Sequence, residues 1–178
     1  ILMIMITFMC SLTSTTAVSI SLEGKRLWIL RSLPVSVRDI FVSKIIVNLT
    51  ATLPFILLAN IAIWILFPVT VSMYHIFLIL IPTVVAFIIS IGGLYINLLF
   101  PKFDWDVEIK VIKQSVSVLM SVLLGFLLVG VGAGLFILLS DLLDTMYLMF
   151  IITAIYMLFV VLFIWLLEKD GTKRFLKL

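Results

Sequence analysis

Five long stretches without Asp, Glu, Lys or Arg divide this chain, and they constrain its fold more than any other feature. Each is long enough to cross the roughly 30 Å hydrocarbon core of a bilayer as a helix of about 20 residues. None shows the alternation of apolar and polar residues that is typical of membrane-spanning strands. The stretches cover residues 1–22, 45–67, 75–100, 115–139 and 145–167. With 65% hydrophobic and 12% charged residues, the chain also lies outside the range of soluble proteins. We expect an all-α polytopic integral membrane protein with five transmembrane helices, forming one transmembrane domain over residues 1–178.

The start of the chain indicates a piece of a longer protein. It begins with Ile1, and the apolar run "ILMIMITFMC" has no basic region before it, so it is not typical of a signal peptide. A single cysteine, Cys10, excludes an internal disulfide.

The basic residues are completely segregated between the connections. All twelve Lys and Arg lie in 23–44, in 101–114 and after residue 167, whereas 68–74 and 140–144 contain none. Five spans place the three basic segments on one side, which is the cytoplasm by the positive-inside rule. We therefore expect a multi-pass membrane protein whose basic segments face the cytoplasm.

The first basic segment, 23–44, is much longer than a turn between two helices requires. Apolar residues recur in it at helical spacing at Leu27, Leu30 and Leu33. The intervening polar positions are Glu23, Lys25, Arg26 and Arg31. This pattern predicts a short amphipathic helix over 22–33 that ends at Pro34. Ser36 and Asp39 then resemble a capping box for the next helix.

Two interpretations of this amphipathic helix stay open from the residues alone. It is either an interfacial helix, with Trp28 and the basic residues at the lipid headgroups, or a docking helix. In the second case the leucine ridge would fill a groove on a partner.

The second basic segment, 101–114, predicts another short amphipathic helix. Its acidic residues come first and its lysines last, which complements the helix dipole. They are Asp104, Asp106 and Glu108, followed by Lys110 and Lys113. Trp105, Ile109 and Ile112 would share one face, and we favour an interfacial tether over a second contact with a partner.

Small and polar residues inside the spans predict how the helices pack. Gly130 and Gly134 form a small-xxx-small pair that would permit close helix approach. Pro54 and Pro82 predict kinks. The amides at Asn48, Asn60 and Asn97 are expected to bond neighbouring helices or to line a pathway.

The stretch "EGKRLWILRSLPVSVRDIFVSK" resembles the signature of type-2 ATP-binding-cassette (ABC) exporter permeases. The matching positions are Glu23, Pro34, Val35, Ser36, Arg38, Asp39 and Lys44. Downstream, "NLLFPKFDWDVEIKVIKQS" is similar to a bacterial subgroup of ABC exporters.

The resemblance implies a six-span permease unit, of which this chain would hold spans two to six. In that family the helix after the second span is the coupling helix, which docks on a separate ATPase subunit. It implies a coupling role here for Glu23, Gly24, Lys25, Arg26, Leu27, Leu30, Arg31 and Pro34. It also implies a second permease half or a homodimer.

The sequence itself favours a separate energy source. No G-x-x-x-x-G-K-[ST] phosphate loop occurs in it, and the charge-free spans disfavour a proton-driven transporter. We expect no enzymatic activity, no catalytic residues, no cofactor, no metal and no nucleic-acid partner. The alternative hypothesis is a non-transporting membrane scaffold or sensor that uses the same cytoplasmic helix to hold a partner. A charge-free interior hints only at amphipathic or lipid-like cargo.

Overall fold

The computed structural model describes residues 2–32, 34–66 and 74–178, and within these residues the chain forms helices and no strand. The elements are α1 (Leu2–Leu12), α2 (Thr16–Ser19), the 3₁₀ segment η1 (Ser21–Arg26), α3 (Leu27–Ser32), α4 (Val37–Leu66), α5 (Tyr74–Leu99), α6 (Glu108–Gln114), α7 (Val116–Leu139), α8 (Thr145–Leu166), the π-helical segment η2 (Leu167–Gly171) and α9 (Thr172–Lys177).

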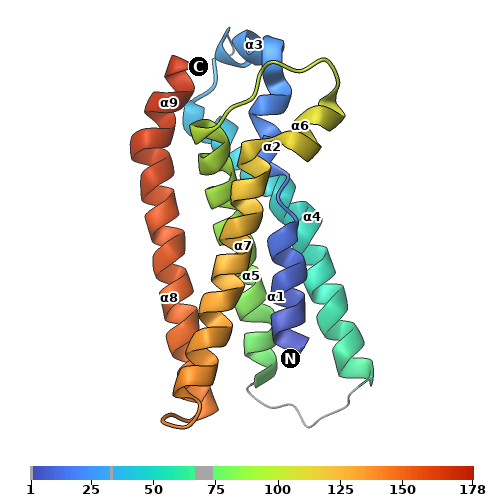
Figure 1. The fold of residues 1–178 in the computed structure, drawn as a ribbon, viewed down its shortest axis with the longest axis vertical. Helices are drawn as coiled ribbons and strands as arrows, with labels where there is room; N and C mark the ends of the chain where they lie inside the picture. The colour runs from blue at the N-terminus through green and yellow to red at the C-terminus, as the bar shows by residue number, and fades with distance from the viewer. Residues whose placement is uncertain (1, 33, 67–73) are drawn as a thin grey trace.

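Five segments of the described chain are long and apolar enough to cross a membrane, which confirms the expected all-α polytopic architecture. They are Leu2–Gly24, Val37–Leu66, Tyr74–Leu99, Val116–Leu139 and Thr145–Lys177. The long helices run side by side in one elongated bundle (Figure 1).

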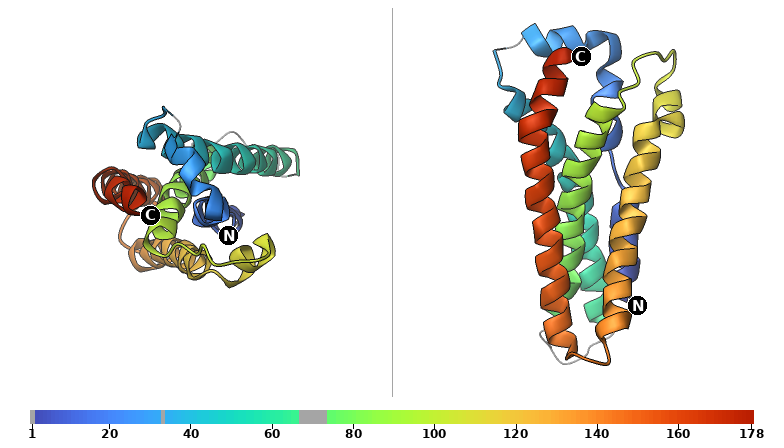
Figure 2. Two further views of the ribbon diagram at one scale, coloured as in Figure 1. Left: turned by 90° about the horizontal axis from the view of Figure 1, so that it is seen from above. Right: turned by 60° about the vertical axis from the view of Figure 1, so that its left-hand side comes forward.

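Helix α5 lies at the centre of the bundle and contacts α1, α2, α4, α7 and α8 (Figure 2). Small residues let its neighbours approach closely: a Cβ on Gly92 would lie 2.9 Å from a methyl carbon of Leu124. The helix continues through Pro82, as α4 does through Pro54. The surrounding helices expose large apolar side chains, such as Phe55 and Leu158, as expected for surfaces that face lipid.

The first span is interrupted inside the stretch 1–22, which was expected to cross as a helix. Helix α1 ends at Leu12 and α2 begins at Thr16, with no proline between them. A hydroxyl side chain competes there for a backbone acceptor, since Thr13 Oγ1 donates a hydrogen bond to the Cys10 carbonyl at 2.8 Å. The break leaves backbone N–H groups that need partners outside the helix, because unpaired groups are costly at membrane depth.

Asn97 on α5 holds the far end of α2, where the first span passes into η1, and its side chain is fully buried. Its Oδ1 atom accepts from the backbone N–H groups of Ile20 at 2.8 Å and Ser21 at 3.1 Å. Its Nδ2 atom donates to Ser21 Oγ at 2.8 Å and to Ser117 Oγ at 3.2 Å. One amide therefore joins the broken span to α5 and α7.

Asn48 on α4 holds the break itself. Its Oδ1 atom accepts from the Thr15 N–H at 3.0 Å and from Thr15 Oγ1 at 2.8 Å. Its Nδ2 atom donates to Ser90 Oγ on α5 at 2.6 Å. Asn60 also donates to a neighbouring helix, at the Leu78 carbonyl. The predicted bonds from asparagines to neighbouring helices are thus confirmed.

The glycine packing of α7 differs from the prediction. Among the residues that the structure describes, a Cβ on Gly130 or Gly134 would meet no heavy atom within 4 Å, so the pair does not mediate close approach between these helices. Two other glycines of α7 lie at close contacts. A Cβ on Gly125 would lie 2.8 Å from the Cβ of Ser11, and the hydroxyl of Tyr156 packs against Gly132 while donating to the Leu128 carbonyl at 2.7 Å. Residues two apart on a helix point to nearly opposite sides, so α7 turns the other glycine face outward.

The three basic segments lie at one end of the bundle, as the charge pattern predicted. Figure 1 shows α3, α6 and α9 at the end that holds the C terminus, with the N terminus and the α7–α8 turn toward the other end. The connection 68–74 lies almost wholly outside the described residues. That the basic end faces the cytoplasm stays a prediction.

Candidate functional site

The segment Ser21–Ser32, formed by η1 and α3 and called here the elbow, changes direction sharply at Gly24. Gly24 has φ 48° and ψ −124°, in the left-handed region that favours glycine. A Cβ there would also lie 3.0 Å from the indole of Trp105. Backbone conformation and close packing therefore both require glycine at this position. The elbow places α3 at the end of the bundle (Figure 2).

Trp105 fastens the second basic segment to the elbow. Its indole Nε1 donates to the Ser21 carbonyl at 2.9 Å, and the Lys102 N–H donates to Ser21 Oγ at 3.0 Å. The tryptophan therefore packs against the inner side of the elbow.

The predicted helix over the second basic segment begins later than expected. Helix α6 starts at Glu108, so Trp105 lies before it. The prediction that Trp105 shares a helical face with Ile109 and Ile112 is therefore wrong. Those two isoleucines are exposed. The hydrogen bond and the packing of the indole outweigh local helical preference, which is the reason for the difference.

An ion pair joins the two ends of the signature stretch. Lys44 Nζ donates to Glu23 Oε1 at 2.7 Å and to the Ser19 carbonyl at 3.2 Å. The side chains are 14% and 32% exposed, so water screens this pair less than a surface pair. The sequence singled out both residues without pairing them. Together they close the elbow against α4.

The leucine ridge of α3 faces the chain's own core, which corrects the expected docking geometry. Leu27 is 6% exposed and packs in a cluster with Ile20, Phe41 and Phe175, and Leu30 packs against that cluster. The turn at Gly24 directs these side chains back to the bundle. Leu27 is therefore not available to a partner in this structure, and Leu33 lies outside the described residues.

The outer face of the elbow carries Arg26, Trp28, Ile29 and Ser32. Trp28 is 67% exposed and Ile29 is 43% exposed.

Pro34 is exposed just beyond the elbow. Among the predicted coupling residues whose side chains are described, the structure turns Arg26 and Pro34 outward, buries Gly24 and Leu27, and leaves Glu23 and Leu30 half-buried. The outward position of Trp28 follows from its place next to the buried Leu27.

The predicted cap at Ser36 is confirmed at the start of α4, but Asp39 pairs with the Ser36 hydroxyl and not with the backbone N–H that a capping box uses. Ser36 Oγ accepts from the Asp39 N–H at 3.2 Å and donates to Asp39 Oδ2 at 2.6 Å. The cap orients the first turn of α4, which leads to Lys44 and hence to the ion pair.

The site is suited to contact with another protein. The elbow is held to the bundle and exposes Trp28 and Arg26. Trp and Arg are among the residue types that contribute most to the binding energy of protein interfaces. Within residues 2–32, 34–66 and 74–178, no cluster of three His, Cys, Asp or Glu side chains could hold a metal ion. Comparisons with protein-family models, with curated proteins and with solved structures find no match for this chain.

Proposed function

We propose that this chain is the membrane-spanning permease part of an ABC exporter, with no catalytic activity of its own. In this proposal a separate ABC ATPase subunit hydrolyses ATP and docks on the elbow, and a second permease half or a second copy completes the transporter. Its location would be the bacterial cytoplasmic membrane. The resemblance in 23–44 and the geometry of the elbow support the proposal.

The observation that carries the proposal is that the elbow is fixed on its inner side and exposes a tryptophan and an isoleucine, beside Arg26 and Ser32, on its outer side. Trp105, the Glu23–Lys44 ion pair and buried Leu27 hold it to the bundle. Trp28 and Ile29 project from it. A partner that binds this outer face would move an element tied directly to the spans.

Two spans would receive that movement first. The elbow continues the broken first span, and Lys44 ties it to α4 through Glu23 and the Ser19 carbonyl. The break between Leu12 and Thr16 divides the first span into two helices. We infer that docking at the elbow repositions α2 and α4 relative to α1, which is how ATP hydrolysis would reach the transport path.

The docking hypothesis is tested by replacing Trp28 with Ala in the full-length protein, purified from its native membrane. Wild type should co-purify a protein with a G-x-x-x-x-G-K-[ST] loop and should hydrolyse ATP. Trp28→Ala should lose most of both at normal membrane levels, because the side chain is exposed and contributes little to the fold. Trp64→Ala is the matched control, since Trp64 is exposed near the other end of α4.

Two outcomes would refute the proposal. An ATPase that stays bound and active in Trp28→Ala would remove the elbow as the docking site. A partner without ATP hydrolysis, lost in the same variant, would instead favour the scaffold or sensor hypothesis.

The orientation has its own test in intact cells, with single cysteines in a Cys10→Ser background. Leu142→Cys in the α7–α8 turn should react with a membrane-impermeant thiol reagent. Trp28→Cys should be protected until the membrane is permeabilised. The reverse pattern would place the basic end outside, where no cytoplasmic ATPase could dock.

A further inference from the structure

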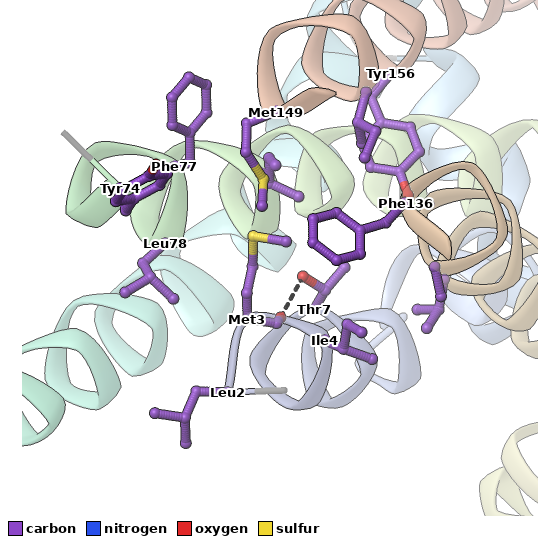
Figure 3. A pocket seen from close by; sticks show the side chains of 15 residues that line it. Leu2, Met3, Ile4, Thr7, Tyr74, Phe77, Leu78, Phe136, Met149 and Tyr156 are labelled. Carbon is purple, nitrogen blue, oxygen red and sulfur yellow. Dashed lines mark hydrogen bonds between the residues drawn. The ribbon is translucent and has the colours of Figure 1, made fainter. Parts of the chain in front are cut away.

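A cavity of about 480 Å³ lies between α1, α5, α7 and α8 (Figure 3). It is next to the start of α1, and Figure 1 shows the N terminus toward the end of the bundle opposite α3. Its lining includes Met3 and Thr7 from α1, Phe77 from α5, Phe136 from α7, and Met149 and Tyr156 from α8. Leu2 and Tyr74 also line it and are exposed, so the cavity reaches the surface of the bundle.

The cavity offers no charged group among its described lining residues, and its two innermost hydroxyls are occupied. Thr7 Oγ1 donates to the Met3 carbonyl at 2.7 Å, as the dashed line in Figure 3 marks. The Tyr156 hydroxyl donates to the Leu128 carbonyl at 2.7 Å. A water molecule or a polar ligand would therefore find few partners. The chemistry of the lining selects an apolar occupant.

The packing explains why this space exists. Helices α1 and α8 both pack against α5, and Met3 and Met149 extend from them toward each other (Figure 3). Gly132 adds no side chain on the α7 wall. Methionine side chains are flexible and fill irregular space, so such walls can close around an elongated apolar group or relax without it.

We propose that this cavity binds one acyl chain of a membrane phospholipid. All four helices belong to segments that span the membrane, so the medium at the cavity mouth is hydrocarbon. The volume lies within the roughly 300–1,000 Å³ typical of sites for small ligands. Tyr74 stands at the start of α5, where an aromatic ring marks the level of the lipid headgroups. The headgroup then stays outside the cavity while its chain enters along α1. This site goes beyond the proposed function, since it requires no ATPase.

The test uses the full-length protein in phosphatidylcholine nanodiscs that contain a phosphatidylcholine with a diazirine in one acyl chain. After irradiation, mass spectrometry maps the adducts. We expect them on Met3 and Met149 several-fold above those on Leu158, a lipid-facing residue of α8. Labelling of the cavity residues no higher than that of Leu158 would overturn the proposal.

A cavity-filling variant makes the test specific. Ala133→Phe places a ring in the cavity and should remove most adducts at Met149, whereas the matched control Leu158→Phe should leave them unchanged. If Ala133→Phe does not fold, Ala133→Leu serves the same purpose. Retained adducts in a folded filling variant would refute the site. Labelling by a free diazirine fatty acid but not by the phospholipid would also refute it, because the occupant would then be a different molecule.

Discussion

Replacing Asn97 with Leu removes the amide that joins the broken first span to α5 and α7. Leucine has a similar volume and keeps the site apolar, so the substitution tests the hydrogen bonds and not the packing. Four bonds are lost, and two of them satisfy backbone N–H groups of the broken span.

The expected cost follows from these contacts. Hydrogen bonds that polar side chains make between helices in membrane bundles are worth about 0.6 kcal/mol each on average, so the four bonds of the Asn97 amide are worth about 2.4 kcal/mol. The N–H groups of Ile20 and Ser21 then stay buried without a partner, at about 1–3 kcal/mol for each group. Because these contributions overlap, we expect Asn97→Leu to lower the free energy of unfolding by about 2–5 kcal/mol.

The measurement is SDS-induced unfolding in mixed micelles, followed by tryptophan fluorescence. Asn60→Leu is the control, because its amide is only half-buried and donates to the carbonyls of Ile56 and Leu78 without holding the break. Asn97→Leu should be clearly less stable than Asn60→Leu. Equal stability of the two variants would refute the claim that Asn97 supports the interrupted span.

Three further substitutions test other parts of the packing in the same unfolding assay. Gly132→Ala should cost about 1–3 kcal/mol, because its new methyl group would clash with a tyrosine hydroxyl of α8, whereas Gly130→Ala should be neutral or slightly stabilising. A destabilised Gly130→Ala would contradict this assignment of the α7 faces. Glu23→Lys should destabilise the elbow by about 1–2 kcal/mol, and adding Lys44→Glu should restore part of the loss; no recovery would argue against the ion pair. Thr16→Val should be neutral or stabilising, since Thr16 Oγ1 is buried with no hydrogen-bond partner; clear destabilisation would reveal one.

The sequence alone determined the number, type and approximate limits of the spans. The stretch expected at 75–100 is Tyr74–Leu99, and the one expected at 145–167 contains the helix Thr145–Leu166. Bilayer thickness and the cost of buried charge act on each segment independently, so composition and length are sufficient. The gathering of the basic segments and the cap at Ser36 followed from equally local rules.

For part of the candidate site, the sequence also predicted the type of interaction but not the partners. The asparagines inside the spans were visible in the sequence and were expected to bond neighbouring helices or to line a pathway. Their specific partners were not, because Asn97 lies 77 residues from Ile20 in the chain. The pairing of Glu23 with Lys44 likewise needed the fold to bring both ends of the signature stretch together.

Tertiary structure alone decided which face of each element packs inward. A helix such as α7 is apolar nearly all round, so the pattern of its residues does not distinguish a lipid-facing side from a helix-facing side. The rotation that packs Gly132 against Tyr156 and exposes Gly130 is set by shape and close contact with α8. The same holds at the elbow, where the turn at Gly24 directs Leu27 into the core and leaves Trp28 outside. A local pattern records that a residue is apolar, whereas the arrangement of neighbouring helices determines what that residue touches.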